Sequence, residues 1–251
     1  RKNGDGGDVM VVDTTNSRVG LGKAPDTLLH LYSTSASKPI LKIENEQGGS
    51  NPVSIQMLRN TSSPDDDDFI GQIDFRSMND ASTPEEILYA YISSQSTDIT
   101  DGTEDGEINF FTMKAGTLTN TMTMQSGNVG IGEDDPLSTL VVRGANAVNP
   151  SNGSGGNHTL QLIDTTSIAQ GVGGGIAFGG NFVGSTETLF AEIRGIKENA
   201  TSHDFDGALT FSTRLEDASI AERMRLTSTG QLGIGTGANI DELLHVQASS
   251  G

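Results

Sequence analysis

Three copies of one short phrase divide this chain, and this repeat constrains the fold more than any other feature of the sequence. In each copy, glycines alternate with aliphatic residues, and a short apolar segment follows after a turn. The copies are Val19-Gly20-Leu21-Gly22, Val129-Gly130-Ile131-Gly132 and Leu232-Gly233-Ile234-Gly235. A repeat of long period sets the architecture of a chain. The sequence therefore predicts two similar modules between three copies of a connector.

The segments between the connectors repeat as well, since several blocks of the first module have counterparts in the same order in the second. Leu88-Tyr89-Ala90 corresponds to Leu189-Phe190-Ala191, and Ile108-Asn109-Phe110 corresponds to Leu209-Thr210-Phe211. We therefore predict five segments in order. They are an N-terminal strand with the first connector (1–31), a first β module (32–127), a second connector (128–143), a second β module (144–230) and a third connector (231–251).

The strong segments of both modules alternate apolar and polar residues with a period of two, which is typical of β-strands. In one segment, Phe69, Ile73 and Phe75 are predicted to share a face. In the next, Leu88, Ala90 and Ile92 are predicted to share a face, with Tyr89 and Tyr91 opposite them. Asp-Gly pairs between the segments favour tight turns, because both residues tolerate positive φ. The chain is therefore predicted to be almost entirely β.

The composition is poor in material for two independent cores. Only 33% of the residues are hydrophobic and 5% are aromatic, with no Trp. An apolar share of about 45–50%, glycine included, is typical of globular domains. Two explanations remain open: small sandwiches with thin cores, or modules that complete their cores by associating with other copies. The second is favoured.

The connector pattern favours association around a threefold axis. In a strand, Val129 and Ile131 point to the same side and the glycines to the other, and glycine in a strand usually marks close approach of another backbone. The alternative is a strand-turn with a glycine bulge inside a monomer. Three occurrences at module boundaries favour the axis. The predicted fold is thus all-β: two repeated β-sandwich-like modules, joined by Gly-rich connectors and intertwined as a homotrimeric fibre.

Charge and residue usage exclude several classes of protein. The chain has 33 acidic and 15 basic residues, a formal net charge of −18. Such a surface repels phosphate backbones, so we expect no nucleic-acid partner. No apolar run approaches the roughly 20 residues of a membrane span, so we expect no membrane insertion. The absence of Cys excludes disulfides, thiolate metal sites and cysteine nucleophiles.

Candidate sites are few, and each has a simpler explanation. Acidic residues in one turn-rich stretch offer oxygen ligands for calcium: Asp98, Asp101, Glu104 and Asp105. A solvated turn explains them better, so no metal is expected. Tyr89 and Tyr91 could form a small platform for a sugar or a protein, but packing against a neighbouring chain is favoured. No hydrolase triad or phosphate loop is recognisable, so we expect neither an enzyme nor a cofactor.

The ordered set of motifs resembles a known family. The phrase Val129-Gly130-Ile131-Gly132 with its following turn, and the segment from Gly207 to Val246, are similar to the repeats of tailed-bacteriophage tail fibres and related trimeric virion appendages. Members of this family are often followed by an intramolecular chaperone domain with self-cleaving peptidase activity. This chain shows no such segment before Gly251, so that activity is not carried over.

The resemblance implies a structural segment of a trimeric fibre on a virion, outside the cell. Its partners would be two further copies of itself and other fibre or tail segments at both ends, and it would act as a stiff spacer for host attachment. The alternative is a receptor-binding module that contacts host glycans through lateral loops near Asp65, from Ala145 to His158 and from Gly179 to Thr186. A monomeric adhesin or a calcium-loaded surface protein also stays open.

Overall fold

The computed structural model describes residues 10–36, 38–46, 48–144, 159–216 and 218–247. Within these residues every regular element is a β-strand, which confirms the all-β prediction. No helix in these ranges is long and apolar enough to cross a membrane. Contacts divide the chain into two units, residues 1–63 and 64–251. The five predicted segments stay a prediction. The predicted lateral loop from Ala145 to His158 lies outside the described residues.

The first unit contains one small sheet of three strands in the order β1-β2-β3. These strands are β1 (Met10–Asp13), β2 (Arg18–Leu21) and β3 (Leu29–Leu31). β1 and β2 are antiparallel, whereas β2 and β3 are parallel. The first connector phrase is therefore the middle strand of this sheet, and the apolar segment after its turn is the edge strand.

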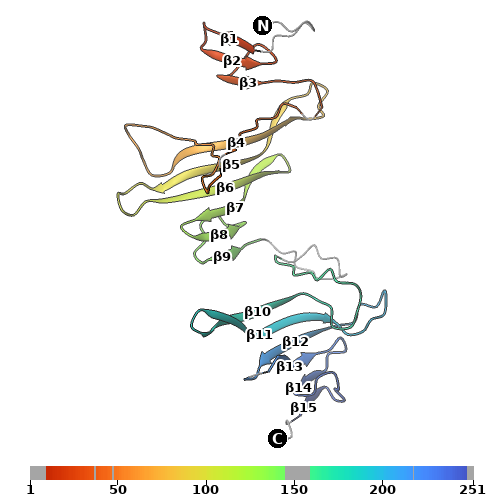
Figure 1. The fold of residues 1–251 in the computed structure, drawn as a ribbon. Helices are drawn as coiled ribbons and strands as arrows, with labels where there is room; N and C mark the ends of the chain where they lie inside the picture. Colours follow the sequence, from red (N-terminus) through yellow and green to blue (C-terminus); the bar gives the residue numbers. More distant parts are fainter. Residues whose placement is uncertain (1–9, 37, 47, 145–158, 217, 248–251) are drawn as a thin grey trace. The chain divides into compact units, whose positions relative to one another are not determined.

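The second unit contains two six-stranded sheets, each with its strands in sequence order (Figure 1). The first sheet consists of β4 (Asp68–Met78), β5 (Glu86–Asp98), β6 (Asp105–Lys114), β7 (Thr117–Gln125), β8 (Asn128–Ile131) and β9 (Leu140–Val142). The second sheet consists of β10 (Gly175–Val183), β11 (Thr186–Lys197), β12 (Gly207–Arg214), β13 (Ile220–Leu226), β14 (Leu232–Ile234) and β15 (Leu244–Val246). In both, all neighbours are antiparallel except the last pair, which is parallel.

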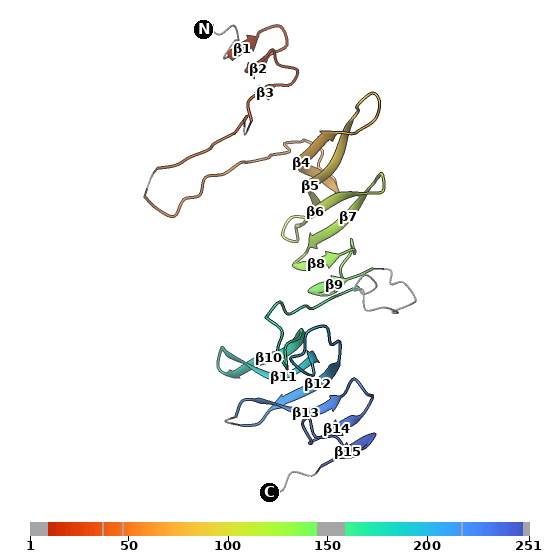
Figure 2. The same ribbon diagram turned by 90° about the vertical axis from the view of Figure 1, so that its right-hand side faces the viewer.

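Each module forms one sheet within the chain, not the two packed layers of a sandwich (Figure 1, Figure 2). The sandwich-like prediction assumed that a chain with alternating strands would fold them back onto each other. Instead, consecutive hairpins add every new strand to the edge of the last, so the described strands build no second layer. A single sheet has no interior of its own, and its faces need cover from elsewhere.

The two six-stranded sheets have β-bulges at equivalent places. In the first sheet, Phe75 pairs with Ala90 and Arg76 with Leu88, so Tyr89 is an extra residue. In the second sheet the extra residue of the same strand pair is Phe190. A further bulge inserts Thr121 in β7 and Arg223 in β13. Since bulges are designed features of a sheet, their recurrence supports the repeat seen in the sequence.

The three connectors share one hydrogen-bonding pattern. In each, the first aliphatic N–H donates to a carbonyl just before the parallel edge strand, at 2.8–3.0 Å: Val19 to Leu28, Val129 to Thr139 and Leu232 to Leu243. After the edge strand, an N–H donates back to the second aliphatic residue: Tyr32 to Leu21, Arg143 to Ile131 and Gln247 to Ile234. The loops between the paired strands, 22–28, 132–139 and 235–243, are shorter than the crossover of about a dozen residues usual between parallel strands.

The connector glycines are explained by contacts within one chain. A Cβ on Gly130 would overlap the carbonyl oxygen of Glu133, in the connector's own loop. Gly132 has a φ of 67°, and a Cβ there would overlap the carbonyl oxygen of Arg143. The close approach predicted for these glycines is therefore real, but the backbone that approaches is the chain's own. The predicted place of the aliphatic residues at a threefold axis stays a prediction.

Candidate functional site

Pairing across the strands divides each six-stranded sheet into an apolar face and a polar face, because residues directly opposite each other share a face. The apolar face contains one uninterrupted row across each sheet. In the first sheet the row is Ile73, Ile92, Phe110, Met122, Ile131 and Val142. In the second it is Ile176, Ile193, Phe211, Met224, Ile234 and Val246. Of the connector residues predicted at the axis, Ile131 and Ile234 belong to these rows, each next to the last position.

The apolar face is open to solvent in the single chain. Ile73 is 48% exposed, Phe75 52%, Ile131 43% and Leu140 60%. In the second sheet, Ile176, Phe178 and Val246 are likewise exposed. Large contiguous apolar patches are rare on soluble monomers and mark interaction surfaces. Each of the two sheets therefore has an apolar face with exposed large side chains in the single chain.

Among the described residues, buried side chains are more often polar than apolar, which is the reverse of a normal core. The buried apolar ones are Ala208, Pro25 and Pro136. The buried polar residues are Ser93, Asn109, Thr123, Thr210, Ser212 and Thr236. Except for Thr236, which lies in the third connector loop, all are on the polar face, and Thr123 pairs with the connector glycine Gly130. The best-buried polar side chains of the described residues are therefore on the polar face, whereas the apolar face has exposed residues.

The bulges correct two predictions about which side chains share a face. Tyr89 and Tyr91 were predicted on one side, but Tyr89 is the bulge residue, and Tyr91 pairs with Asp74 and Phe111 on the polar face. In the second sheet the equivalent bulge residue, Phe190, lies against Gly180 on the apolar face. Leu88 pairs with Arg76 and so leaves the face of Ala90. An extra residue shifts the alternation by one position, so every side chain beyond it changes face.

Phe69 is moved in the same way. It was predicted beside Ile73 and Phe75, but the ladder skips Ile70, and Phe69 pairs with Gln95 on the polar face. There it is 56% exposed. The ring of Tyr91 stacks on that of Phe111, with centroids 4.3 Å apart and planes 11° apart. The polar face of the first sheet therefore carries three aromatic rings, and the position of Phe69 among them does not follow from the sequence pattern.

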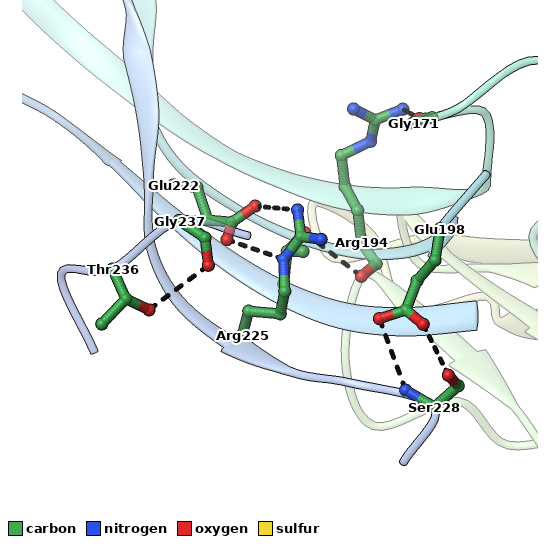
Figure 3. A network of polar contacts seen from close by, with 9 residues as sticks. Gly171, Arg194, Glu198, Glu222, Arg225, Ser228, Thr236 and Gly237 are labelled. Carbon is green, nitrogen blue, oxygen red and sulfur yellow. Dashed lines mark hydrogen bonds and ion pairs between the residues drawn. The ribbon is translucent and has the colours of Figure 1, made fainter. Parts of the chain in front are cut away.

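The polar face of the second sheet is closed by ion pairs and hydrogen bonds (Figure 3). Arg225 donates two hydrogen bonds to the carboxylate of Glu222, at 2.8 and 2.7 Å, and its side chain is 12% exposed. This pair raises the pKa of Arg225 above its ordinary value. Arg194 donates to the carbonyl oxygens of Gly171 and Gly173. The side chains of Arg225, Glu222 and Arg194 therefore fill the centre of this face.

The polar face of the first sheet has a network of amide and hydroxyl groups at its centre instead, which ends on the carboxylate of Glu107. Thr123 donates its hydroxyl to Asn109 Oδ1 at 2.8 Å, and Asn109 donates its amide to Glu107 at 2.6 Å. Asn120 donates to both Asn109 and Thr123, at 3.1 and 2.8 Å. The side chains are therefore fixed in orientation before anything binds to them.

Two of the four calcium candidates, Asp98 and Glu104, accept hydrogen bonds within their own turn. Asp98 accepts hydrogen bonds from the Thr100 N–H and the Thr103 hydroxyl, and Glu104 accepts one from the Gly102 N–H. These bonds hold the pKa of Asp98 below its ordinary value. The described residues contain no cluster of three or more His, Cys, Asp or Glu placed to hold a metal ion. The described geometry therefore fits a solvated turn.

Comparison with protein-family models and with curated proteins finds no match for this chain. Among solved structures, the carboxy-terminal domain of the bacteriophage T5 L-shaped tail fibre is similar with a TM-score of 0.34 and 11% identity, over 82% of this chain and 93% of that one. The same domain with its intra-molecular chaperone domain is similar with a TM-score of 0.34 and 12% identity, over 81% of this chain and 64% of that one. A TM-score this low does not establish a shared fold, and the function of this chain is therefore inferred from its own residues.

Proposed function

We propose that this chain is a non-enzymatic structural segment of a trimeric fibre, of the kind that forms phage tail fibres and similar virion appendages outside the cell. The observation that carries the proposal is the bare apolar face. An unbroken apolar row crosses all six strands of both sheets, and no described strand of the chain covers it. A further copy of the chain offers a surface of the same chemistry.

Three copies that turn their apolar faces toward one axis would give each module the core it lacks. Burying a side chain such as Ile or Phe stabilises an assembly by about 1.5–3 kcal/mol. Each chain brings rows of such residues from two sheets, so the sum is comparable with the roughly 5–15 kcal/mol that stabilise a typical domain. The resulting structure would be a stiff spacer, continuous with other fibre segments at both ends, that holds an attachment site in several copies and so multiplies weak contacts.

The mass in solution tests this proposal, measured by light scattering after size exclusion. Three chains of 26.3 kDa amount to 78.9 kDa. A particle of that mass, with β-sheet circular dichroism and no binding of an apolar dye, is expected. A stable folded monomer would overturn the proposal, because its apolar face would then be open without loss of structure. A dimer would keep the association and overturn the threefold arrangement.

Receptor binding through lateral loops stays the alternative. Two of the three loops are described. In the acidic loop, Asp66 accepts a hydrogen bond from the Ile99 N–H at 3.0 Å, and Asp68 accepts one from the Asp65 N–H at 3.1 Å. These contacts order the loop but are no sign of a ligand. A glycan signal lost on deletion of residues 65–68 or 179–186 would support this alternative.

A further inference from the structure

The polar face of the first sheet contains a cleft of about 400 Å³ between β4–β7 and the loop of the second connector. Its lining combines aromatic rings, amides and carboxylates: Phe69, Phe111, Gln95, Asn109, Asn120, Glu107, Asp134 and Asp135. A concave site with apolar walls and a few fixed polar groups is the usual form of a small-ligand site. The cleft belongs to the second unit alone and lies on the face opposite the apolar rows.

The walls of the cleft are held in place. The loop that carries Asp134 and Asp135 is anchored at one end by Asn128, which donates to the Pro136 carbonyl at 2.8 Å. Near its other end, Glu133 forms an ion pair with Arg143 at 2.7 Å. On the sheet, Phe69 and Phe111 stand on either side of the row that contains Asn109. The aromatic rings therefore flank a polar floor, beneath an acidic loop.

The polar lining of the cleft contains three carboxylates, which only accept hydrogen bonds, beside the amides of Gln95, Asn109 and Asn120. Both amide hydrogens of Asn120 are used by its neighbours, whereas its Oδ1 is buried without a partner in the described structure. A buried polar group without a partner costs free energy, unless a ligand or water satisfies it. The carboxylates of Glu107, Asp134 and Asp135 add further acceptors.

We infer that this cleft binds a neutral or amino sugar unit of a glycan. A pyranose offers several O–H donors to the acceptor-rich floor and walls, and its C–H face packs on an aromatic ring. No Lys or Arg lines the cleft, so an anionic sugar would meet carboxylates without a counter-charge. The inference goes beyond the spacer role and does not depend on it, because the cleft is complete within one chain.

The equivalent place in the second sheet lacks this site. The cleft is therefore specific to the first sheet and is not a general property of the fold. There Arg225 takes the position of Thr123, Glu222 that of Asn120 and Ser212 that of Phe111. Arg225 and Glu222 satisfy each other. The second sheet thus has neither the aromatic walls nor the unpartnered acceptor, and serves as an internal control.

The test is saturation-transfer NMR and calorimetry on the full chain with three oligosaccharides of equal length, one of neutral hexoses, one of glucosamine and one of uronic acids. Binding of the neutral or the glucosamine probe, and at least about tenfold weaker binding of the uronic acid probe, is expected. Phe69→Ala and Asp135→Asn should each weaken binding about tenfold. The matched controls Phe205→Ala, whose aromatic side chain is 96% exposed elsewhere, and Asp101→Asn should leave it unchanged.

Three results would overturn the inference: binding of none of the probes by folded protein, equal loss in the controls, or preference for the uronic acid. Binding of oligolysine alone would do so too, since it would show a general attraction to the acidic surface. The mass of every sample is measured in parallel. A monomer that binds sugar would overturn the fibre proposal and leave the cleft, whereas a trimer that binds none would do the reverse.

Discussion

The two six-stranded sheets have the same strand order and the same two equivalent bulges, yet their polar faces satisfy their polar groups in different ways. In the second sheet, Arg225 and Glu222 fill the centre of the face with a bidentate ion pair. In the first, Thr123, Asn109 and Asn120 form an uncharged network that leaves the Asn120 oxygen without a partner. One framework therefore supports a closed face in one repeat and an open one in the other.

The difference shows which positions the architecture fixes. The apolar rows are nearly identical in kind between the repeats, with an aliphatic, aromatic or Met residue at every position. At equivalent positions of the polar faces, by contrast, one sheet has aromatic or amide residues where the other has charged ones or Ser. The proposed packing of the apolar face against other copies would tolerate few residue types, whereas the polar face can change without loss of the fold.

The three connectors show the same division between fixed backbone and variable side chains. The two positions that face each other across each connector hold Lys23 and Tyr32, in a cation–π contact of 5.3 Å. In the second connector the equivalent pair is Glu133 and Arg143, an ion pair. In the third it is Thr236 and Gln247, which are uncharged.

The largest effect is expected from a charge on the apolar face, tested at equivalent positions of the two sheets. Ile131→Asp and Ile234→Asp should each abolish the trimer, because an unpaired carboxylate would be buried at several kcal/mol. Leu137→Asp is the matched control, since its side chain is 89% exposed in a connector loop. Light scattering measures the result. A trimer that persists in both variants would place the association surface elsewhere.

Two connector glycines differ in what an added Cβ would overlap, backbone in one and side chains in the other. A Cβ on Gly130 would overlap a backbone oxygen, whereas a Cβ on Gly233 would overlap the side chains of Thr236 and Ile240. Side chains move more easily than backbone, so Gly130→Ala should lower the free energy of unfolding by about 3 kcal/mol and Gly233→Ala by about 1 kcal/mol. Chemical denaturation compares the two. An equal fall in the free energy of unfolding of the two variants would contradict the prediction, because both loops would then adjust equally well to the added Cβ.

Removing the ion pair between Arg225 and Glu222 tests how much it stabilises the second sheet. Arg225→Ala leaves Glu222 partly buried and unpaired, so the free energy of unfolding should fall by about 2 kcal/mol. A double variant that also carries Glu222→Gln should recover part of the loss, because no carboxylate is then left alone. Thermal unfolding measures both. If the double variant is less stable than Arg225→Ala, the carboxylate contributes through contacts other than the pair.

The smallest expected effect is a pH dependence of the thermal stability that arises from the ion pair of the second connector. The Arg143 guanidinium holds the pKa of Glu133 below its ordinary value of 4.5. A depressed pKa in the folded state means that the pair stabilises the fold above that value, and that the contribution is lost as the pH falls through the lower, folded pKa. Thermal midpoints between about pH 6 and about pH 3 should therefore fall less in Glu133→Gln than in the parent chain. An unchanged slope would contradict the prediction.

The sequence by itself determined the strands and which residues along most of them share a face, and it predicted the repeat. Period-two alternation places Ile73 with Phe75, Ile108 with Phe110 and Leu209 with Phe211, because side chains in a strand point to alternate faces. The low hydrophobic content left thin cores and association with other copies as two open explanations and favoured the second. The glycines indicated a close backbone approach, although not that the approach is made by the connector's own loop.

Only the tertiary structure decided what each sheet does with its other face. The extra residues at Ile70 and Tyr89 move Phe69 and Leu88 to the polar face, and the alternation of residue types gives no sign of either shift. Asp134 and Asp135 reach the same cleft because the connector loop folds back over Gly130. Alternation is a local property of an extended chain, whereas a bulge and a folded loop depend on how neighbouring strands pair, so the cleft exists only once the sheet has formed.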